Sequence, residues 1–354
     1  MATPMTTTAA PAAAPGDEAL YIDTQHEDLV HDVQMDFYGA KLATCSSDRT
    51  IKVCNVADGS YEVSATLQGH EGPVWQVSWA HPKFGVILAS CSFDGSVLIH
   101  RESRPREWTI IHAARQLHES SVNGVAFAPH EFGLLLAAAS SDGRVSVLQH
   151  DPSNQTWIVD YLQDCPMGVN AVSWAPAGSY YQPPSSSIAA EGESAAAEQQ
   201  PELPSLVTAG CDNTLRFWQR TMSGEWAQQD VPQCSSDSKY SHSDWVRDVS
   251  WAPSLVPNHN RVASCSEDGQ VLIWTQESPT QPWTAQLVKQ FDSPVWRVSW
   301  SATGHILAVS SGDSSVTLWK EGLVDGTWIP METTEEAPAP TDSAMVPPPP
   351  APSN

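Results

Sequence analysis

Basic residues are scarce in this chain: 17 Lys and Arg stand against 41 Asp and Glu among 354 residues, which gives a formal net charge of −24. Proteins that bind nucleic acid neutralise phosphates with clustered Lys and Arg, and no such cluster occurs here. The same deficit argues against unaided docking on an anionic membrane surface. The composition is compatible with solubility and with protein partners.

Paired cysteines and long apolar runs are also missing. The 7 Cys include no Cys-x-x-Cys pair, so the spacing typical of metal sites is absent. Cys45, Cys91 and Cys265 share one position of a repeated motif, and we expect them to be small buried strand residues in a reducing compartment. No apolar run reaches the roughly 18–20 residues of a membrane span. Residues 1–16 lack the basic and apolar regions of a secretory signal.

The sequence does contain one motif written six times. Residues 264–274 read SCSEDGQVLIW, and residues 90–100 read SCSFDGSVLIH. The motif is anchored by an Asp that recurs at Asp48, Asp94, Asp142, Asp212, Asp268 and Asp313. Each Asp opens a tight turn between two alternating or apolar segments, which predicts strand, turn and strand.

A second motif precedes each of these turns. It reads HEGPVWQVSW from His70 and HSDWVRDVSW from His242, and all six copies carry Val at the fifth and eighth positions. This pattern predicts one further strand, and a segment usually marked by Trp after each turn predicts another. The repeating unit is therefore four strands in roughly 45 residues.

Units of this length with a Gly-His and Trp signature are typical of propeller blades, and the chain resembles the WD-repeat family. The resemblance implies an all-β propeller of six four-stranded blades around a channel, with Trp filling the wedges between sheets. One blade cannot bury both of its faces, so the six form one domain, residues 17–331. The expected blades span about residues 26–67, 70–113, 118–164, 165–232, 242–290 and 291–330.

Three segments fall outside the repeats. Residues 1–16 are rich in Ala, Thr and Pro, residues 332–354 are rich in Pro, and both are expected to be disordered tails. The PPPP run is of a kind that SH3-type or WW-type domains bind, although a solubilising tail is the preferred interpretation. The stretch 178–204 interrupts the fourth unit with Ser, Ala, Glu and Pro, and we expect a mobile surface loop.

One unit resembles a hydrolase triad, because His242, Ser264 and Asp268 have suitable side chains. A triad needs an exposed Ser on a sharp turn and an oxyanion hole. The family resemblance instead implies a buried structural tetrad of His242, Ser264, Asp268 and Trp274. Partial copies such as the one at His70 would have no purpose if the set were catalytic. We expect no catalytic residue, no cofactor and no metal.

Long strings such as HSDWVRDVSWAPS (242–254) resemble the small propeller subunits of the COPII vesicle coat, and the resemblance runs over about residues 19–330. It implies a non-enzymatic structural subunit in transport from the endoplasmic reticulum to the Golgi. The implied locations are the cytoplasmic side of the endoplasmic reticulum membrane, COPII vesicles, the nuclear pore complex and the cytosol. The implied partners are a large coat subunit with its own propeller and α-solenoid, a solenoid nucleoporin and a nutrient-signalling complex, in heteromeric assemblies without nucleic acid or membrane insertion.

Six units without a seventh suggest an open ring, whose unpaired strand edges are a liability unless they are covered. Strand addition by a partner would supply a seventh blade between the first and last units. The segment Ala19, Leu20, Tyr21 and Ile22 is expected to help line this gap. The alternative is a regulatory or ubiquitin-ligase adaptor propeller that reads peptides at a charged or aromatic channel mouth. The absence of any Trp-Asp-x-Arg ending counts against the ligase version.

Overall fold

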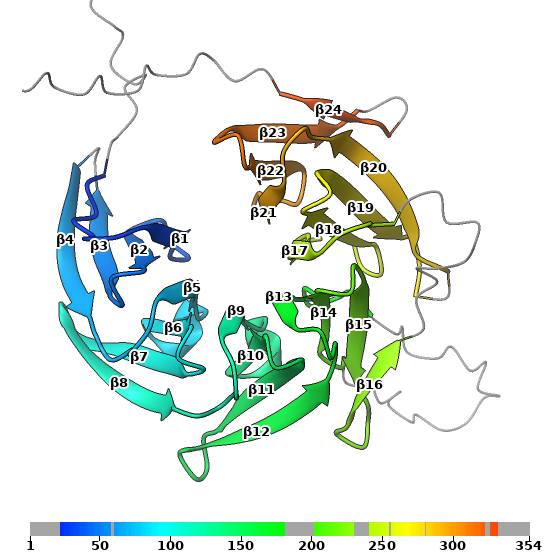
Figure 1. Ribbon diagram of the computed structural model, residues 1–354. Helices are drawn as coiled ribbons and strands as arrows, with labels where there is room; N and C mark the ends of the chain where they lie inside the picture. Colours follow the sequence, from blue (N-terminus) through cyan, green and yellow to red (C-terminus); the bar gives the residue numbers. More distant parts are fainter. Residues whose placement is uncertain are drawn as a thin grey trace, which may run out of the picture.

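The computed structural model describes residues 22–57, 60–180, 202–229, 241–254, 256–279, 281–322 and 326–331. These residues form six four-stranded antiparallel sheets, each built from four strands consecutive in sequence. The sheets lie around a central axis with the first strand of each sheet innermost (Figure 1). The prediction of an all-β propeller with six four-stranded blades is confirmed.

The strand bounds are as follows. Blade 1 contains β1 (Val30–Met35), β2 (Lys41–Ser46), β3 (Ile51–Ala57) and β4 (Ser60–Leu67). Blade 2 contains β5 (Val74–Trp79), β6 (Ile87–Ser92), β7 (Val97–Arg104) and β8 (Glu107–Ala114). Blade 3 contains β9 (Val122–Phe127), β10 (Leu135–Ser140), β11 (Arg144–Asp151) and β12 (Thr156–Gln163).

The second half of the ring repeats this arrangement. Blade 4 contains β13 (Val169–Trp174), β14 (Ser205–Gly210), β15 (Leu215–Arg220) and β16 (Trp226–Gln229). Blade 5 contains β17 (Val246–Trp251), β18 (Asn260–Ser266), β19 (Gln270–Gln276) and β20 (Thr284–Gln290). Blade 6 contains β21 (Val295–Trp300), β22 (Ile306–Ser311), β23 (Val316–Glu321) and β24 (Trp328–Pro330). Two short 3-10 helices, η1 (Pro82–Phe84) and η2 (His130–Phe132), follow β5 and β9.

The repeated Asp shapes the turn between the second and third strands of every blade. In all six turns its Oδ1 accepts a hydrogen bond from the backbone N–H two residues later, at 2.8–3.3 Å. The residue after the Asp has a φ of 67° to 88°, and it is glycine in three blades, at Gly95, Gly143 and Gly269. Asp supplies the side-chain acceptor of such turns, and glycine adopts positive φ without strain.

The hydrophobic core is divided into five clusters, one between each pair of consecutive blades. In each cluster the second and third strands of one blade pack against the two repeated Val of the next blade's inner strand. Trp side chains also cross these interfaces, because the indole N–H of Trp79, Trp174 and Trp300 donates to a carbonyl of the preceding blade at 2.8–3.0 Å. We call these five interfaces the closed seams.

The base of the predicted loop 178–204 belongs to the folded blade. The Glu202 carboxylate accepts hydrogen bonds from the N–H of Gly178 at 2.7 Å, and the Ser179 carbonyl accepts one from Asn260 at 3.0 Å. Residues 181–201 lie outside the described residues, as do both predicted tails, 1–16 and 332–354. No helix in the described ranges is long and apolar enough to cross a membrane.

Candidate functional site at the open seam

The four side chains of the expected tetrad meet in the interior of blade 5. His242 Nε2 lies 2.8 Å from Ser264 Oγ, and Trp274 Nε1 donates to the same oxygen at 2.9 Å. His242 Nδ1 lies 3.5 Å from Asp268 Oδ2. Ser264 has no exposed surface, so its hydroxyl cannot meet a substrate. The geometry links the outer loop to the strands and offers no exposed nucleophile.

The electrostatics of this cluster favour an ionised Asp268. Burial opposes ionisation, but contact with His242 and hydrogen bonds from the N–H groups of Ser243 and Gln270 outweigh it and lower the pKa of Asp268 to about 2. A carboxylate that accepts several hydrogen bonds is stabilised in its charged form. The cluster therefore contributes to stability as a charged network.

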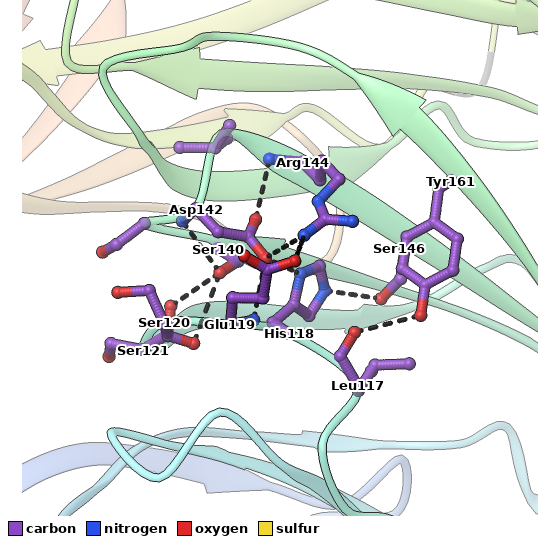
Figure 2. A network of polar contacts seen from close by, with 12 residues as sticks. Leu117, His118, Glu119, Ser120, Ser121, Ser140, Asp142, Arg144, Ser146 and Tyr161 are labelled. Atoms are coloured by element: carbon purple, nitrogen blue, oxygen red, sulfur yellow. Dashed lines mark hydrogen bonds and ion pairs between the residues drawn. The ribbon is translucent and has the colours of Figure 1, made fainter.

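Blade 3 builds a related network with one altered donor (Figure 2). His118 Nδ1 lies 2.9 Å from Asp142 Oδ2, and its Nε2 lies 2.9 Å from Ser146 Oγ. Ala138 stands where blade 5 has Ser264, so the hydroxyl comes from the third strand instead of the second. Counting positions from the Asp could not reveal Ser146, because it stands where blade 5 has Leu272, a position of the motif that carries no member of the tetrad.

Blade 4 replaces the His with a carboxylate that the sequence analysis missed. Asp164 Oδ2 accepts hydrogen bonds from Thr208 Oγ1 at 2.6 Å and from Trp218 Nε1 at 2.8 Å. Arg216 lies 3.5 Å from the other carboxylate oxygen. Burial raises the pKa of Asp164 against these contacts. In blade 4 the His position of the motif is occupied by Cys165. Asp164, one residue earlier, accepts the hydrogen bonds instead, and the Asp-Cys pair at 164–165 was the signal that could have shown this.

Blade 6 keeps Asp313 and Trp319 but cannot form the tetrad, because Phe291 and Val309 occupy the His and Ser positions. Among the described residues, no group of His, Cys, Asp and Glu could hold a metal ion. Cys45, Cys91 and Cys265 are fully buried, and burial raises their thiol pKa values. The feature that distinguishes one region of the molecule lies on its surface.

The surface feature that sets one region apart is the seam between blades 6 and 1. The two repeated Val of β5, Val74 and Val77, have no exposed surface, and their counterparts in β9, β13, β17 and β21 are buried as well. In β1 the same two positions, Val30 and Val33, are 46% and 56% exposed. Within the described residues no core cluster joins blade 6 to blade 1, and Figure 1 shows these blades at the two ends of an arc. We call this region the open seam.

The opposite wall of the open seam shows the same contrast. In blade 5 the residues that face the next blade include Val271 and Ile273, which are buried in the closed seam with blade 6. Their counterparts in blade 6 are Val316, which is 62% exposed, and Leu318, which is half-buried. Apolar side chains therefore line both walls without covering one another.

A series of side chain to backbone links runs around the inner strands and changes at the open seam. Asp32 accepts a hydrogen bond from the Val77 N–H at 3.1 Å, and Asp248 accepts one from the Val298 N–H at 3.0 Å. Arg297 occupies the equivalent position of blade 6, but a guanidinium can only donate. It forms instead an ion pair with Asp32 of blade 1, at 3.3 Å. This ion pair links blade 6 to blade 1 near the axis of the ring.

Arg297 also faces the buried carboxyl of Asp248. Burial raises the pKa of Asp248 to about 6, while Arg297 and two backbone N–H groups oppose that rise. Burial likewise opposes the charge of Arg297, but Asp32 and Asp248 outweigh it and raise the pKa of Arg297. Arg297 thus interacts with Asp248 at the closed seam between blades 5 and 6 and with Asp32 across the open seam.

The predicted edge segment lies only partly within the described residues. Ala19, Leu20 and Tyr21 lie outside them, and Ile22 is half-buried and belongs to no strand. The next residues run along the outer strands of blade 1, since the Asp23 N–H donates to the Tyr61 hydroxyl at 3.0 Å. The role of Ala19–Ile22 at the open seam stays a prediction.

Comparison with known proteins agrees with this architecture. The family model "WD domain, G-beta repeat" matches residues 18–55, 61–101, 234–275 and 285–320. The matches fall on blades 1, 2, 5 and 6 and leave out blades 3 and 4, where Ala138 and Asp164 alter the tetrad. Fold and repeats define the molecule as a WD-repeat β-propeller.

Individual relatives narrow this class. The protein transport protein SEC13 of Mycosarcoma maydis is 43% identical, over 92% of this chain and 98% of the relative. The SEC13 homolog of Homo sapiens is 46% identical, over 87% of this chain and 90% of its own length, and that of Drosophila melanogaster is 44% identical over 87% and 82%. The chain belongs to the SEC13 family.

Proposed function

We propose that this protein is a non-enzymatic structural subunit in protein transport, and that it works by accepting a β-blade from a partner at the open seam. The transport role is supported by the relatives, several of which are named protein transport proteins. The blade-accepting mechanism is supported chiefly by the exposure of Val30 and Val33 at positions that are buried in every other blade.

The chemistry of the open seam indicates what would fill it. A seventh sheet would bury Val30 and Val33 on one side and Val316 and Leu318 on the other, as each closed seam buries their counterparts. Burying such side chains stabilises a complex by roughly 25 cal/mol per Å² of apolar surface, before the entropy of association is subtracted. A partner segment of alternating apolar strands fits this seam better than a helix, because both walls are sheet faces like those that pack on sheets in the closed seams.

The register of the repeats also accounts for the predicted edge segment. The second family match begins inside β4, the outer strand that precedes the His70 motif. By the same register, residues 18–22 of the first match stand where the outer strand of a preceding blade would lie. Ala19–Ile22 would then border the blade supplied by the partner.

The finer proposal places the protein in the COPII coat, with a large subunit that carries a propeller and an α-solenoid as partner. Membership of the nuclear-pore scaffold, with a solenoid nucleoporin, and of a nutrient-signalling complex would use the same seam. These assemblies place it at the endoplasmic reticulum membrane, on vesicles, at the nuclear pore and in the cytosol. One seam accepts one blade, so these partners would exclude one another on a single copy.

The test is affinity purification of the tagged full chain from its own cells, with stoichiometry read by mass spectrometry. The wild-type chain should bring down a large solenoid subunit in near-equimolar amount. Val33→Asp should reduce that recovery at least tenfold, because it places a charge on a wall that the partner must desolvate. Val316→Asp tests the opposite wall in the same way.

Ile158→Asp is the matched control, since Ile158 on β12 is 53% exposed and distant from the open seam in sequence and blade order. It should leave recovery unchanged. If Val33→Asp and Ile158→Asp behave alike, or if the wild-type chain is a monomer with only substoichiometric partners, the blade-accepting role is wrong. The second outcome would favour the adaptor alternative.

A further inference from the structure

A cavity of about 720 Å³ opens where the inner strands begin, at one mouth of the central channel. Its lining includes Trp75, Trp245, Trp296 and Met167, together with Arg247 and Arg297. Trp245 and Trp296 are 41% and 45% exposed, and Met167 is 63% exposed. Aromatic and Met side chains of this size are normally covered unless they serve recognition.

The two exposed indoles are held in place by a cation. The Arg247 guanidinium lies 5.1 Å from the ring centre of Trp245 and 5.1 Å from that of Trp296. Its charge is balanced by an ion pair with Glu267. Blades 5 and 6 thus present two ordered indoles at the mouth, where a ligand needs to order little before it binds.

Acidic residues surround this mouth. The loops that lead into the inner strands carry exposed carboxylates at Glu27, Asp28, Glu71, Glu119, Asp244 and Asp292. Glu119 pairs with Arg144, and Glu71 lies 4.0 Å from Arg115. The carboxylates of Glu27, Asp28, Asp244 and Asp292 form no ion pair within the described part of the chain. The unpaired negative charge is therefore concentrated in the loops of blades 1, 5 and 6.

We infer that this channel mouth binds an extended peptide segment that carries Arg or Lys next to an apolar side chain. The exposed indole surface of Trp245 and Trp296 can receive a cationic side chain through a cation–π contact. The apolar neighbour would cover Met167 and the remaining indole surface. The exposed carboxylates would attract the basic segment and raise its association rate at low salt. This site adjoins one edge of the open seam, because Val30 lines the cavity, but the other wall residues, Val33, Val316 and Leu318, do not.

The experiment pans a phage-displayed library of random nine-residue peptides against the immobilised full chain. Peptides with a central Arg or Lys beside Leu, Ile or Phe should be enriched, and Asp and Glu should be depleted. The affinity of the leading peptide, measured by fluorescence polarisation, should fall several-fold when salt is raised from about 50 to about 200 mM, because the charged contacts are exposed. No enrichment, or enrichment without excess of basic residues, would overturn the inference.

Two variants locate the site. Trp245→Ala/Trp296→Ala and Asp244→Lys/Asp292→Lys should each weaken binding of that peptide at least tenfold. The second pair tests charge without removing packing, since both carboxylates are exposed. Glu225→Lys is the control, because it reverses the charge of an exposed residue in the turn between β15 and β16, which does not line the cavity. It should change affinity less than twofold. Equal affinity in all variants would contradict the assignment.

A further variant separates this inference from the proposed function. Val33→Asp should abolish partner recovery and leave peptide affinity unchanged. If both are lost together, the peptide is held by the open seam and the channel-mouth site is wrong.

Discussion

The closed seams and the open seam carry the same types of residue at equivalent positions, yet these residues are buried at the closed seams and exposed at the open seam. β5 and β1 carry the same pair of Val, and both pair with a following strand in the same antiparallel register. Val74 and Val77 are buried by blade 1, whereas no blade in the described part of the chain precedes Val30 and Val33, which are half exposed. The comparison shows that burial of these Val residues is set by the neighbouring sheet, and that the same apolar side chains are exposed where the described residues supply no neighbour.

The largest expected effect on stability comes from placing a charge at one position of a closed seam and comparing it with the same change at the open seam. Val77→Asp should destabilise the fold by about 4 kcal/mol or more, because it buries an unpaired carboxylate in a packed interface. Val33→Asp should change stability by less than about 0.5 kcal/mol, as for other exposed positions. Urea unfolding of both variants measures the difference. Similar losses would mean that β1 is covered in solution.

A second test compares the turns of blades 5 and 6. A Cβ on Gly269 would lie 2.5 Å from the carbonyl oxygen of Phe291 in the next blade, and its φ of +77° is strained for other residues. Gly269→Ala should therefore cost about 2–4 kcal/mol. Ser314, at the same place in blade 6, has a φ of 67°, and no further blade follows it among the described residues.

Ser314→Gly should accordingly stabilise the chain by up to about 1 kcal/mol, by relieving the positive φ. Thermal or urea unfolding reads both changes. A loss of stability in Ser314→Gly comparable with that of Gly269→Ala would contradict the contrast between the two turns.

A pH test addresses the carboxyl that a closed seam buries. Because burial raises the folded-state pKa of Asp248 to about 6, folding takes up a proton there near neutral pH. Its contribution to stability is full below the unfolded pKa of about 4 and is lost as pH rises through about 6. Relative to Asp248→Asn, the wild-type chain should gain about 1 kcal/mol between pH 7 and pH 5. A constant difference across that range would show that Asp248 is not desolvated.

The smallest expected effect comes from removing the hydroxyl of Ser173 or of Ser299, which stand at the same position of the inner strands β13 and β21. Ser173 Oγ accepts a hydrogen bond from the Trp251 N–H across a closed seam at 2.9 Å, so Ser173→Ala should cost about 1–2 kcal/mol by leaving that N–H unpaired. Ser299, at the same position of β21, is exposed at the open seam. Ser299→Ala should be neutral in the same unfolding assay, and a matching loss would indicate an unseen partner for its hydroxyl.

The sequence alone was enough to predict the six blades, because each unit repeats two local signals: paired Val on the inner strand and an Asp-led turn. It could not distinguish Val33 from Val77, since the two have the same local pattern and differ only in what lies across the seam. Asp164 and Ser146 escaped prediction for a related reason. A buried polar partner can be replaced by any group that reaches the same point in space, from an adjacent position or another strand.

The linking role of Arg297 and Asp248 was also hidden in the sequence. Both stand immediately before the second Val of their strands, where Gln, Gly and Ala occur in other blades. A position so variable carries no motif. Only the geometry shows that Asp32, Gln76 and Asp248 accept a backbone hydrogen bond across three of the closed seams, whereas a donor, Arg297, stands at the open seam.

Accessibility of Val33 with and without the partner tests the central claim most directly. Val33→Cys, in a Cys234→Ser background, would be labelled with a maleimide in the free full chain and in the complex purified from cells; the other six cysteines are buried. Ile158→Cys serves as the control for general access. We predict rapid labelling of Val33→Cys in the free chain and at least tenfold protection in the complex, with Ile158→Cys labelled equally in both. Equal labelling of Val33→Cys in the two states would contradict the proposal that a partner blade fills the open seam.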